Sequence, residues 1–135
     1  MLRLETDIEG KKAHFGYLRD QLTPLGYTIG ENWDYYKGSF DNILSREGGE
    51  TIYLRIPFEV AQGVMDSYET QIRFQTPYVI KHVVNLGLDD DEASLIDASV
   101  NQFQKPLDKD GQIENKNKWL HVGEEAVNEV LRYVQ

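Results

Sequence analysis

Three cations and a histidine between residues 55 and 82 are the residues best suited to chemistry. Arg55, Arg73 and Lys81 fall on the opposite parity from the apolar residues around them, so pairing of their strands would gather these side chains on one face. Clustered cations bind carboxylates and other anions. His82 adds a group that can transfer a proton near neutral pH. The four residues therefore predict a ligand-binding site for an anion, although the sequence assigns no catalytic residue.

The same four residues also fit a purely structural interpretation. Cations on a polar sheet face commonly pair across strands with acids such as Glu59. His82 has the parity of the apolar residues and would point away from Lys81, unless a bulge at Pro77 redirects the side chains. Convergence of all four in one pocket would favour a ligand site or an enzyme. Bridges from Arg55 and Arg73 to acids on a flat face would disfavour both.

An aromatic segment provides a second candidate surface. It contains Trp33, Tyr35, Tyr36 and Phe40 within eight positions. Exposed aromatic residues favour recognition of a partner, whereas aromatic residues in a sheet mostly fill the core. The first interpretation predicts an interface at these four residues, and the second predicts a core position for them.

The elements that must position these residues are two long strands. Apolar residues occupy alternate positions in 52–60 and again in 72–84, which predicts strands over 51–60 and 70–86 that each bury one face. Pro57 and Pro77 lie inside these strands and cannot donate a ladder hydrogen bond. We therefore expect an edge or a bulge at each proline.

Helices are expected near both ends of the sequence. Apolar residues at helical spacing predict a helix over 11–23, which Pro24 and Gly26 end. Further strands are expected at 2–8 and 98–104, and a polar loop at 105–118. A terminal helix follows the loop, with Glu124 and Glu125 in its first turn. The chain is thus predicted to be one α+β domain over 1–135, a mainly antiparallel sheet with both helices packed on one face.

The amino-acid composition limits the kinds of partner and cofactor that we expect. The chain has 135 residues, 23 acidic against 14 basic, a net charge of −9 and no cysteine. An acidic surface repels phosphate backbones, so we expect no nucleic-acid partner, and no segment has the length and apolarity of a membrane span. Cysteine-based metal sites are excluded, and Asp108–Gly111 lacks the flanking ligands of a calcium loop. We expect a cytoplasmic protein with no cofactor, no metal and no membrane partner.

Several segments resemble the YugN-like family. They are residues 53–58 (YLRIPF), 76–82 (TPYVIKH) and 101–108 (NQFQKPLD), preceded by the aromatic segment from Trp33 to Asp41. The resemblance spans nearly the whole chain. It implies a small cytoplasmic protein of Bacillus-type bacteria with an α+β fold, and it carries over no activity and no catalytic residues.

These observations favour a non-enzymatic module that binds a protein partner or a small ligand and self-associates as a homodimer. The alternative is an enzyme or a binder of anionic or carboxylate ligands, centred on Arg55, Arg73, Lys81 and His82. A third hypothesis is an interaction protein whose acidic C-terminal third attracts a basic partner, with binding that salt weakens.

Overall fold

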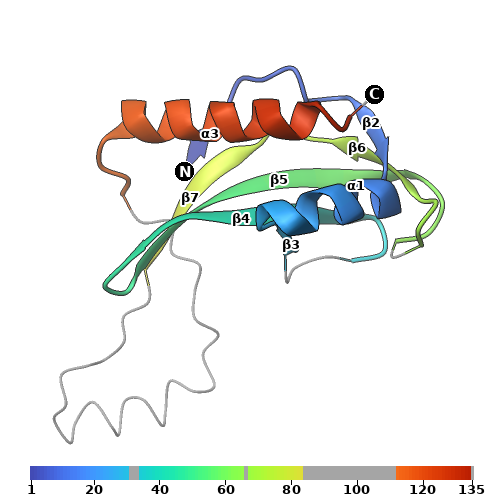
Figure 1. The fold of residues 1–135 in the computed structure, drawn as a ribbon, viewed down its shortest axis with the longest axis horizontal. Coiled ribbons are helices and arrows are strands. Elements are labelled where there is room, and N and C mark those ends of the chain that lie inside the picture. Colours follow the sequence, from blue (N-terminus) through green and yellow to red (C-terminus); the bar gives the residue numbers. More distant parts are fainter. Residues whose placement is uncertain (31–33, 66, 84–111, 135) are drawn as a thin grey trace, which may run out of the picture.

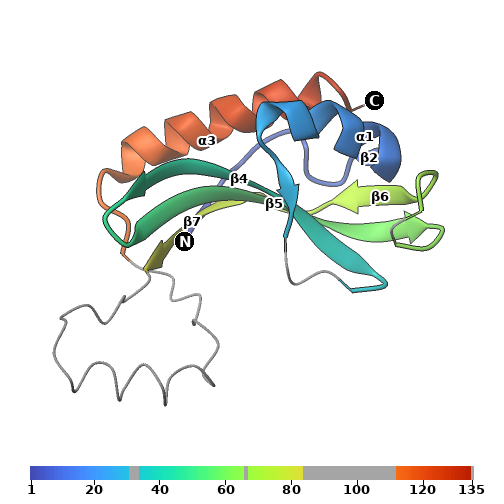
Figure 2. The same cartoon turned by 60° about the horizontal axis from the view of Figure 1, so that its bottom comes forward.

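The protein folds into one antiparallel sheet with two helices on the same side (Figures 1 and 2). The computed structural model describes residues 1–30, 34–65, 67–83 and 112–134. The strands are β1 (Leu2–Arg3), β2 (Lys12–His14), β3 (Thr28–Ile29), β4 (Lys37–Glu47), β5 (Glu50–Gln62), β6 (Gln71–Phe74) and β7 (Tyr78–Val83). The helices are α1 (Phe15–Leu22), the 3-10 turn η1 (Thr23–Leu25) and α3 (Lys116–Leu131). The α+β fold predicted from the sequence is therefore confirmed.

The long strand β5 organises the sheet. It pairs with β4 along one side, and on the other side with β7 over its first half and with β6 over its second half. The full sheet order is β1-β7-β5-β4-β3, and β2 pairs with the outer side of β6. The alternating residues Leu54, Ile56 and Phe58 are fully buried beneath the helices, as the apolar pattern predicted.

Pro57 lies in this central strand, opposite the break between β6 and β7. The Gln75 N–H donates to the Pro57 carbonyl at 2.9 Å. A residue in an antiparallel ladder directs its N–H and C=O to the same side, so the missing N–H of Pro57 faces the break. The prediction of a bulge at Pro57 is wrong, because the register shift lies further along, between Val60 and Gln62. The ladder on this side of β5 is nevertheless interrupted between Arg55 and Phe58, so Pro57 occupies a local edge that requires no ladder hydrogen bond from it.

The same break divides the predicted strand 70–86 and reverses its parity. Ile72 and Phe74 face the helices before the break, and Val79 does so after it, opposite Leu54. The face of every later residue in β7 is therefore opposite to the face that an unbroken alternation predicts. Lys81 turns toward the helix-covered face, whereas Tyr78, Ile80 and His82 lie on the other.

The core is built from residues of both helices and the sheet. Phe15 of α1 packs on Phe40 and Phe58, with ring centroids 5.9 and 6.0 Å away. Burial of each phenylalanine contributes about 1.5–3 kcal/mol. On α3, a Cβ built on Gly123 would lie 2.8 Å from Leu4 Cδ1, so the glycine allows the helix to approach the sheet closely. None of the helices in the described part of the chain has the length and apolarity to cross a membrane.

Several predicted boundaries need correction. Residues 12–14 form β2 instead of the start of a helix, because they pair with β6. The terminal helix begins at Lys116, so Glu124 lies in its middle and the end of the predicted loop is helical. The strand at the start is limited to Leu2–Arg3, although Leu4 and Ile8 are buried. The predicted strand 98–104 and the loop up to residue 111 lie outside the described residues.

Candidate functional site

Figure 2 shows that both helices lie on one side of the sheet, and we call the opposite side the open face. Arg55 of the central strand β5 lies on this open face. In register it lies between Asp41 of β4 and Tyr78 of β7. Its Nε is 3.1 Å from Asp41 Oδ1 and its Nη2 is 3.2 Å from Asp41 Oδ2, a two-point ion pair. The exposed fractions of the two side chains are 17% and 16%, so solvent screens this pair only partly.

Two tyrosines and a serine complete the contacts of this ion pair. Arg55 donates to the hydroxyls of Tyr78 and Tyr53, each at 3.4 Å, and its guanidinium carbon is 5.3 Å from the Tyr53 ring centroid. The Ser39 hydroxyl donates to Asp41 Oδ1 at 3.0 Å. We call these five residues the Arg55 network.

The network keeps Arg55 charged and neutralises that charge. Burial lowers the pKa of Arg55, but hydrogen bonds to Asp41 and Tyr78 and the negative charge of Asp41 outweigh burial and raise it. A guanidinium held in this way stays protonated near neutral pH and therefore does not act as a general acid or base. An incoming anion would have to displace Asp41. The arrangement is suited to holding three strands together.

The other predicted ligand-binding residues do not converge with Arg55. Arg73 lies 3.5 Å from Glu59 on the open face, with 44% and 45% of these side chains exposed. Lys81 lies on the helix-covered side, 3.1 Å from Glu50, and donates to the Gln112 carbonyl. The prediction of one shared cation face is therefore wrong for Lys81.

His82 lies on the open face opposite Thr51. It shares that face with Arg55 and Arg73, while its neighbour Lys81 does not. Each of the three cations is already paired with a carboxylate. Cations that are paired with carboxylates and do not share one pocket disfavour a catalytic or anion-binding centre at these four residues. A ligand-binding role for them stays a prediction.

The aromatic segment divides between surface and core. Tyr35 and Tyr36 are 73% and 77% exposed in the turn just before β4. Asp34 Oδ1 accepts hydrogen bonds from the N–H groups of Tyr36 and Lys37 and fixes this turn. Phe40 is 1% exposed and packs on Phe58, so its predicted place at an interface is wrong. Trp33 lies outside the described residues.

A groove that no sequence pattern predicted lies at the β2 edge of the sheet. It encloses about 640 Å³ and presents more apolar than polar surface. We call it the tyrosine groove, lined by Lys12, Ala13, His14, Tyr17, Tyr68, Glu69, Gln71 and Tyr133. Its residues come from β2, α1, the segment before β6, the first residue of β6 and the segment that follows α3. No sequence motif joins these segments, because only the fold brings them together.

Gly16 shapes one wall of the tyrosine groove. Its N–H donates to the Tyr68 carbonyl at 3.0 Å, and a Cβ built on it would meet the Tyr68 ring and lie 2.7 Å from that carbonyl oxygen. A glycine in a helix costs up to about 1 kcal/mol, and here the cost allows Tyr68 to lie against α1. The unusual glycine was therefore the one sequence signal for the groove.

Tyr68 is fixed further by two residues of α1. Its hydroxyl donates to Asp20 Oδ2 at 3.1 Å, and the Arg19 guanidinium carbon lies 6.0 Å from its ring centroid. The hydrogen bond to Asp20, together with the negative charge of that carboxylate, raises the pKa of Tyr68. The ring is thus held in place while 53% of the residue stays exposed.

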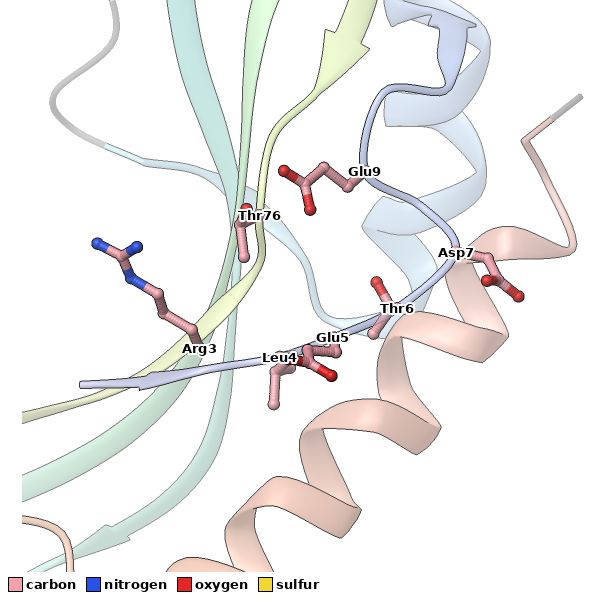
Figure 3. Close-up of a pocket in the computed structure, with 7 residues that line it drawn as sticks. All are labelled: Arg3, Leu4, Glu5, Thr6, Asp7, Glu9 and Thr76. Atoms are coloured by element: carbon pink, nitrogen blue, oxygen red, sulfur yellow. The ribbon is translucent and has the colours of Figure 1, made fainter.

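A second hollow, of about 460 Å³, lies beside β1 (Figure 3). Three of its lining residues are acidic, but Figure 3 shows Glu9 turned toward Thr76 and Asp7 turned the other way. Among the described residues, no three histidine, aspartate or glutamate side chains are grouped to hold a metal ion. The polar side chains of this hollow therefore do not converge on one point.

Comparisons with known proteins agree with the resemblance noted in the sequence. The model of the YugN-like family matches residues 3–134. The chain is 30% identical over 131 residues to YugN of Bacillus subtilis (strain 168), covering 96% of each protein, and 30% identical over 106 residues to YlbA of the same strain, covering 78% of this chain and 88% of YlbA. The crystal structure of YugN from Geobacillus kaustophilus HTA426 has the same fold, with a TM-score of 0.57 and 23% identity over 96% of this chain and 99% of that one. The chain belongs to the YugN-like family.

Proposed function

We propose that this chain is a non-enzymatic, cytoplasmic binding protein whose ligand occupies the tyrosine groove. The observation that carries the proposal is the convergence of three tyrosines, Tyr17, Tyr68 and Tyr133, on one hollow of about 640 Å³. That volume is in the range of ligand pockets, which span about 300–1,000 Å³. Tyrosine is enriched in binding sites because its flat ring gives a large apolar contact and its hydroxyl a hydrogen bond.

The polar groups of the groove support binding more than catalysis. It contains one histidine, His14, and one carboxylate, Glu69, and within the described part of the chain no hydrogen bond or ion pair joins them. A nucleophile activated by a base requires contact between the two groups. A site for recognition requires only that polar groups surround an apolar floor.

Small aromatic probes test the proposal. Indole and N-acetyl-tyrosine amide would be titrated into the ¹⁵N-labelled protein, and amide shifts would be followed by NMR. We expect the shifts to cluster at residues 12–17, 68–71 and 133, and to be lost in Tyr17→Ser and Tyr133→Ser. Tyr35→Ser is the matched control, because Tyr35 is exposed outside the groove. Shifts confined to the open face, or unchanged by Tyr17→Ser, would overturn the proposal.

The exposure of Tyr35 and Tyr36 supports a second proposal, self-association through the start of β4. Sedimentation equilibrium would compare the protein with a Tyr35→Ser/Tyr36→Ser variant. We expect the dimer to weaken in the variant, and a monomer at every concentration would reject self-association.

A further inference from the structure

Strand β2 is an edge of the sheet whose outer side is unpaired in the described part of the chain. The Phe15 N–H donates to the Thr70 carbonyl at 2.8 Å, and the Phe74 N–H donates to the Lys11 carbonyl at 2.9 Å. The Lys11 carbonyl and the Phe15 N–H therefore point toward β6. Because this direction alternates along an antiparallel strand, Lys12 and His14 direct their N–H groups outward.

This unpaired edge lies within the tyrosine groove. All three residues of β2 line the groove, together with Tyr17 and Tyr133. A backbone that hydrogen-bonded to Lys12 and His14 would thus run along tyrosine rings that can contact its side chains. An exposed edge with adjacent pockets is the arrangement by which proteins bind extended peptides through strand addition.

The charge at this edge differs from the charge of the whole protein. The chain carries a net charge of −9, but Lys11 and Lys12 are exposed and make no ion pair within the residues that the structure describes. Lys12 also lies directly opposite a second cation, Arg73, whose own partner is Glu59. Like charges in direct register repel each other, so an added negative charge would be stabilising there.

We propose that the tyrosine groove binds an extended, acidic peptide segment of a partner protein, which adds to the sheet as a strand beside β2. This inference rests on the proposed function and specifies its class of ligand. Glu69 also lines the groove, and its carboxylate would repel acidic side chains of the peptide. The acidic side chains are therefore favoured near Lys12. The competing role of Lys11 and Lys12 is to keep other strands away from an open edge.

The test uses an N-acetylated hexapeptide of alternating glutamate and valine. Two further versions carry N-methyl groups on alternate residues, one on the first set of positions and one on the second. Only alternate N–H groups of a strand face a given neighbour, so strand addition predicts that one version binds and the other does not. A peptide with lysine in place of glutamate tests the charge.

We expect the parent peptide to slow hydrogen exchange at the Lys12 and His14 amides. One N-methylated version and the lysine peptide should each bind about tenfold more weakly or worse, the scale of one or two lost hydrogen bonds or charge contacts. Lys12→Glu should weaken binding of the parent peptide by a similar factor. Lys116→Glu is the matched control, since Lys116 is at the end of α3 opposite to Tyr133.

The outcomes separate this inference from the proposed function. If the aromatic probes bind the groove but both N-methylated peptides bind as well as the parent, strand addition is wrong and the groove remains a binding site. If the parent peptide does not bind, or Lys12→Glu does not alter its affinity, the acidic-peptide inference is likewise overturned. If neither probes nor peptides bind, both proposals fail.

Discussion

The Arg55 network and the tyrosine groove use similar residues to opposite ends. Both contain tyrosine rings and a nearby arginine, Arg55 in one and Arg19 in the other. At the centre of the sheet, neighbouring strands on both sides supply Asp41 and Tyr78, so Arg55 is fully partnered. At the other site, β2 has a neighbouring strand on one side only among the described residues, and the tyrosines of the groove line open space. Position in the sheet, more than residue type, separates a structural cluster from a binding surface.

The comparison is tested most strongly by Arg55→Ala. The change leaves Asp41 partly buried without its cation and removes the contacts of two tyrosine rings. We expect the free energy of unfolding to fall by about 2–3 kcal/mol, measured by urea denaturation. Arg73→Ala, which breaks the exposed pair with Glu59, should cost no more than about 0.5 kcal/mol. Equal effects of the two changes would mean that the network is no more structural than a surface pair.

A second test inserts a methyl group next to the network. A Cβ built on Gly30 would collide with Ser39 Oγ and lie 2.9 Å from Asp41 Oδ2. Gly30→Ala should therefore destabilise the fold by about 2 kcal/mol, in the range for overpacked sites. Adding Ser39→Ala to Gly30→Ala removes the nearest atom and should recover part of the loss in thermal melting. No recovery would show that the strain lies elsewhere.

Gly16→Ala makes the matching change at the groove. Alanine normally stabilises a helix relative to glycine by about 1 kcal/mol, but here it would meet the Tyr68 backbone carbonyl. We expect a net destabilisation of about 1 kcal/mol, since overpacking costs about 1–3 kcal/mol, together with weaker binding of the aromatic probes. A stabilised variant with unaltered probe binding would show that Tyr68 does not depend on the glycine.

The smallest effect concerns the pKa of Tyr68. The Asp20 carboxylate accepts from the Tyr68 hydroxyl and repels its ionised form, which raises the pKa. Asp20→Asn should lower it toward the ordinary tyrosine value of about 10, as followed by the ring NMR shifts during alkaline titration. Because the raised pKa belongs to the folded state, the stabilisation is present below pH 10 and disappears as the pH rises through the folded-state value. An unaltered pKa would mean that the contact with Asp20 does not form in solution.

The sequence predicted the strand at 51–60 and its buried face, because alternation of apolar and polar residues along one unbroken strand directly reflects which face is buried. It also predicted both helices, although Lys12–His14 became a strand because β6 supplies the partner that makes it one. Alternation failed between β6 and β7, where residues 75–77 lie outside both strands, so the faces of β7 are reversed and Lys81 is separated from Arg55. The tyrosine groove could not be predicted from spacing, because its lining residues come from segments that are distant in the sequence and meet beside β2 only in the folded chain.

The break opposite Pro57 also has a mechanical meaning. Along one side, β5 pairs first with β7 and then with β6, so the sheet consists of two halves that β5 joins. The Arg55 network belongs to the half with β7, and most of the tyrosine groove belongs to the half with β6 and β2. Tyr133 of the groove follows α3, whose Gly123 lies against Val79 of β7. Twisting of one half relative to the other would therefore move Tyr133 relative to β2 and open or narrow the groove, without separating Arg55 from Asp41.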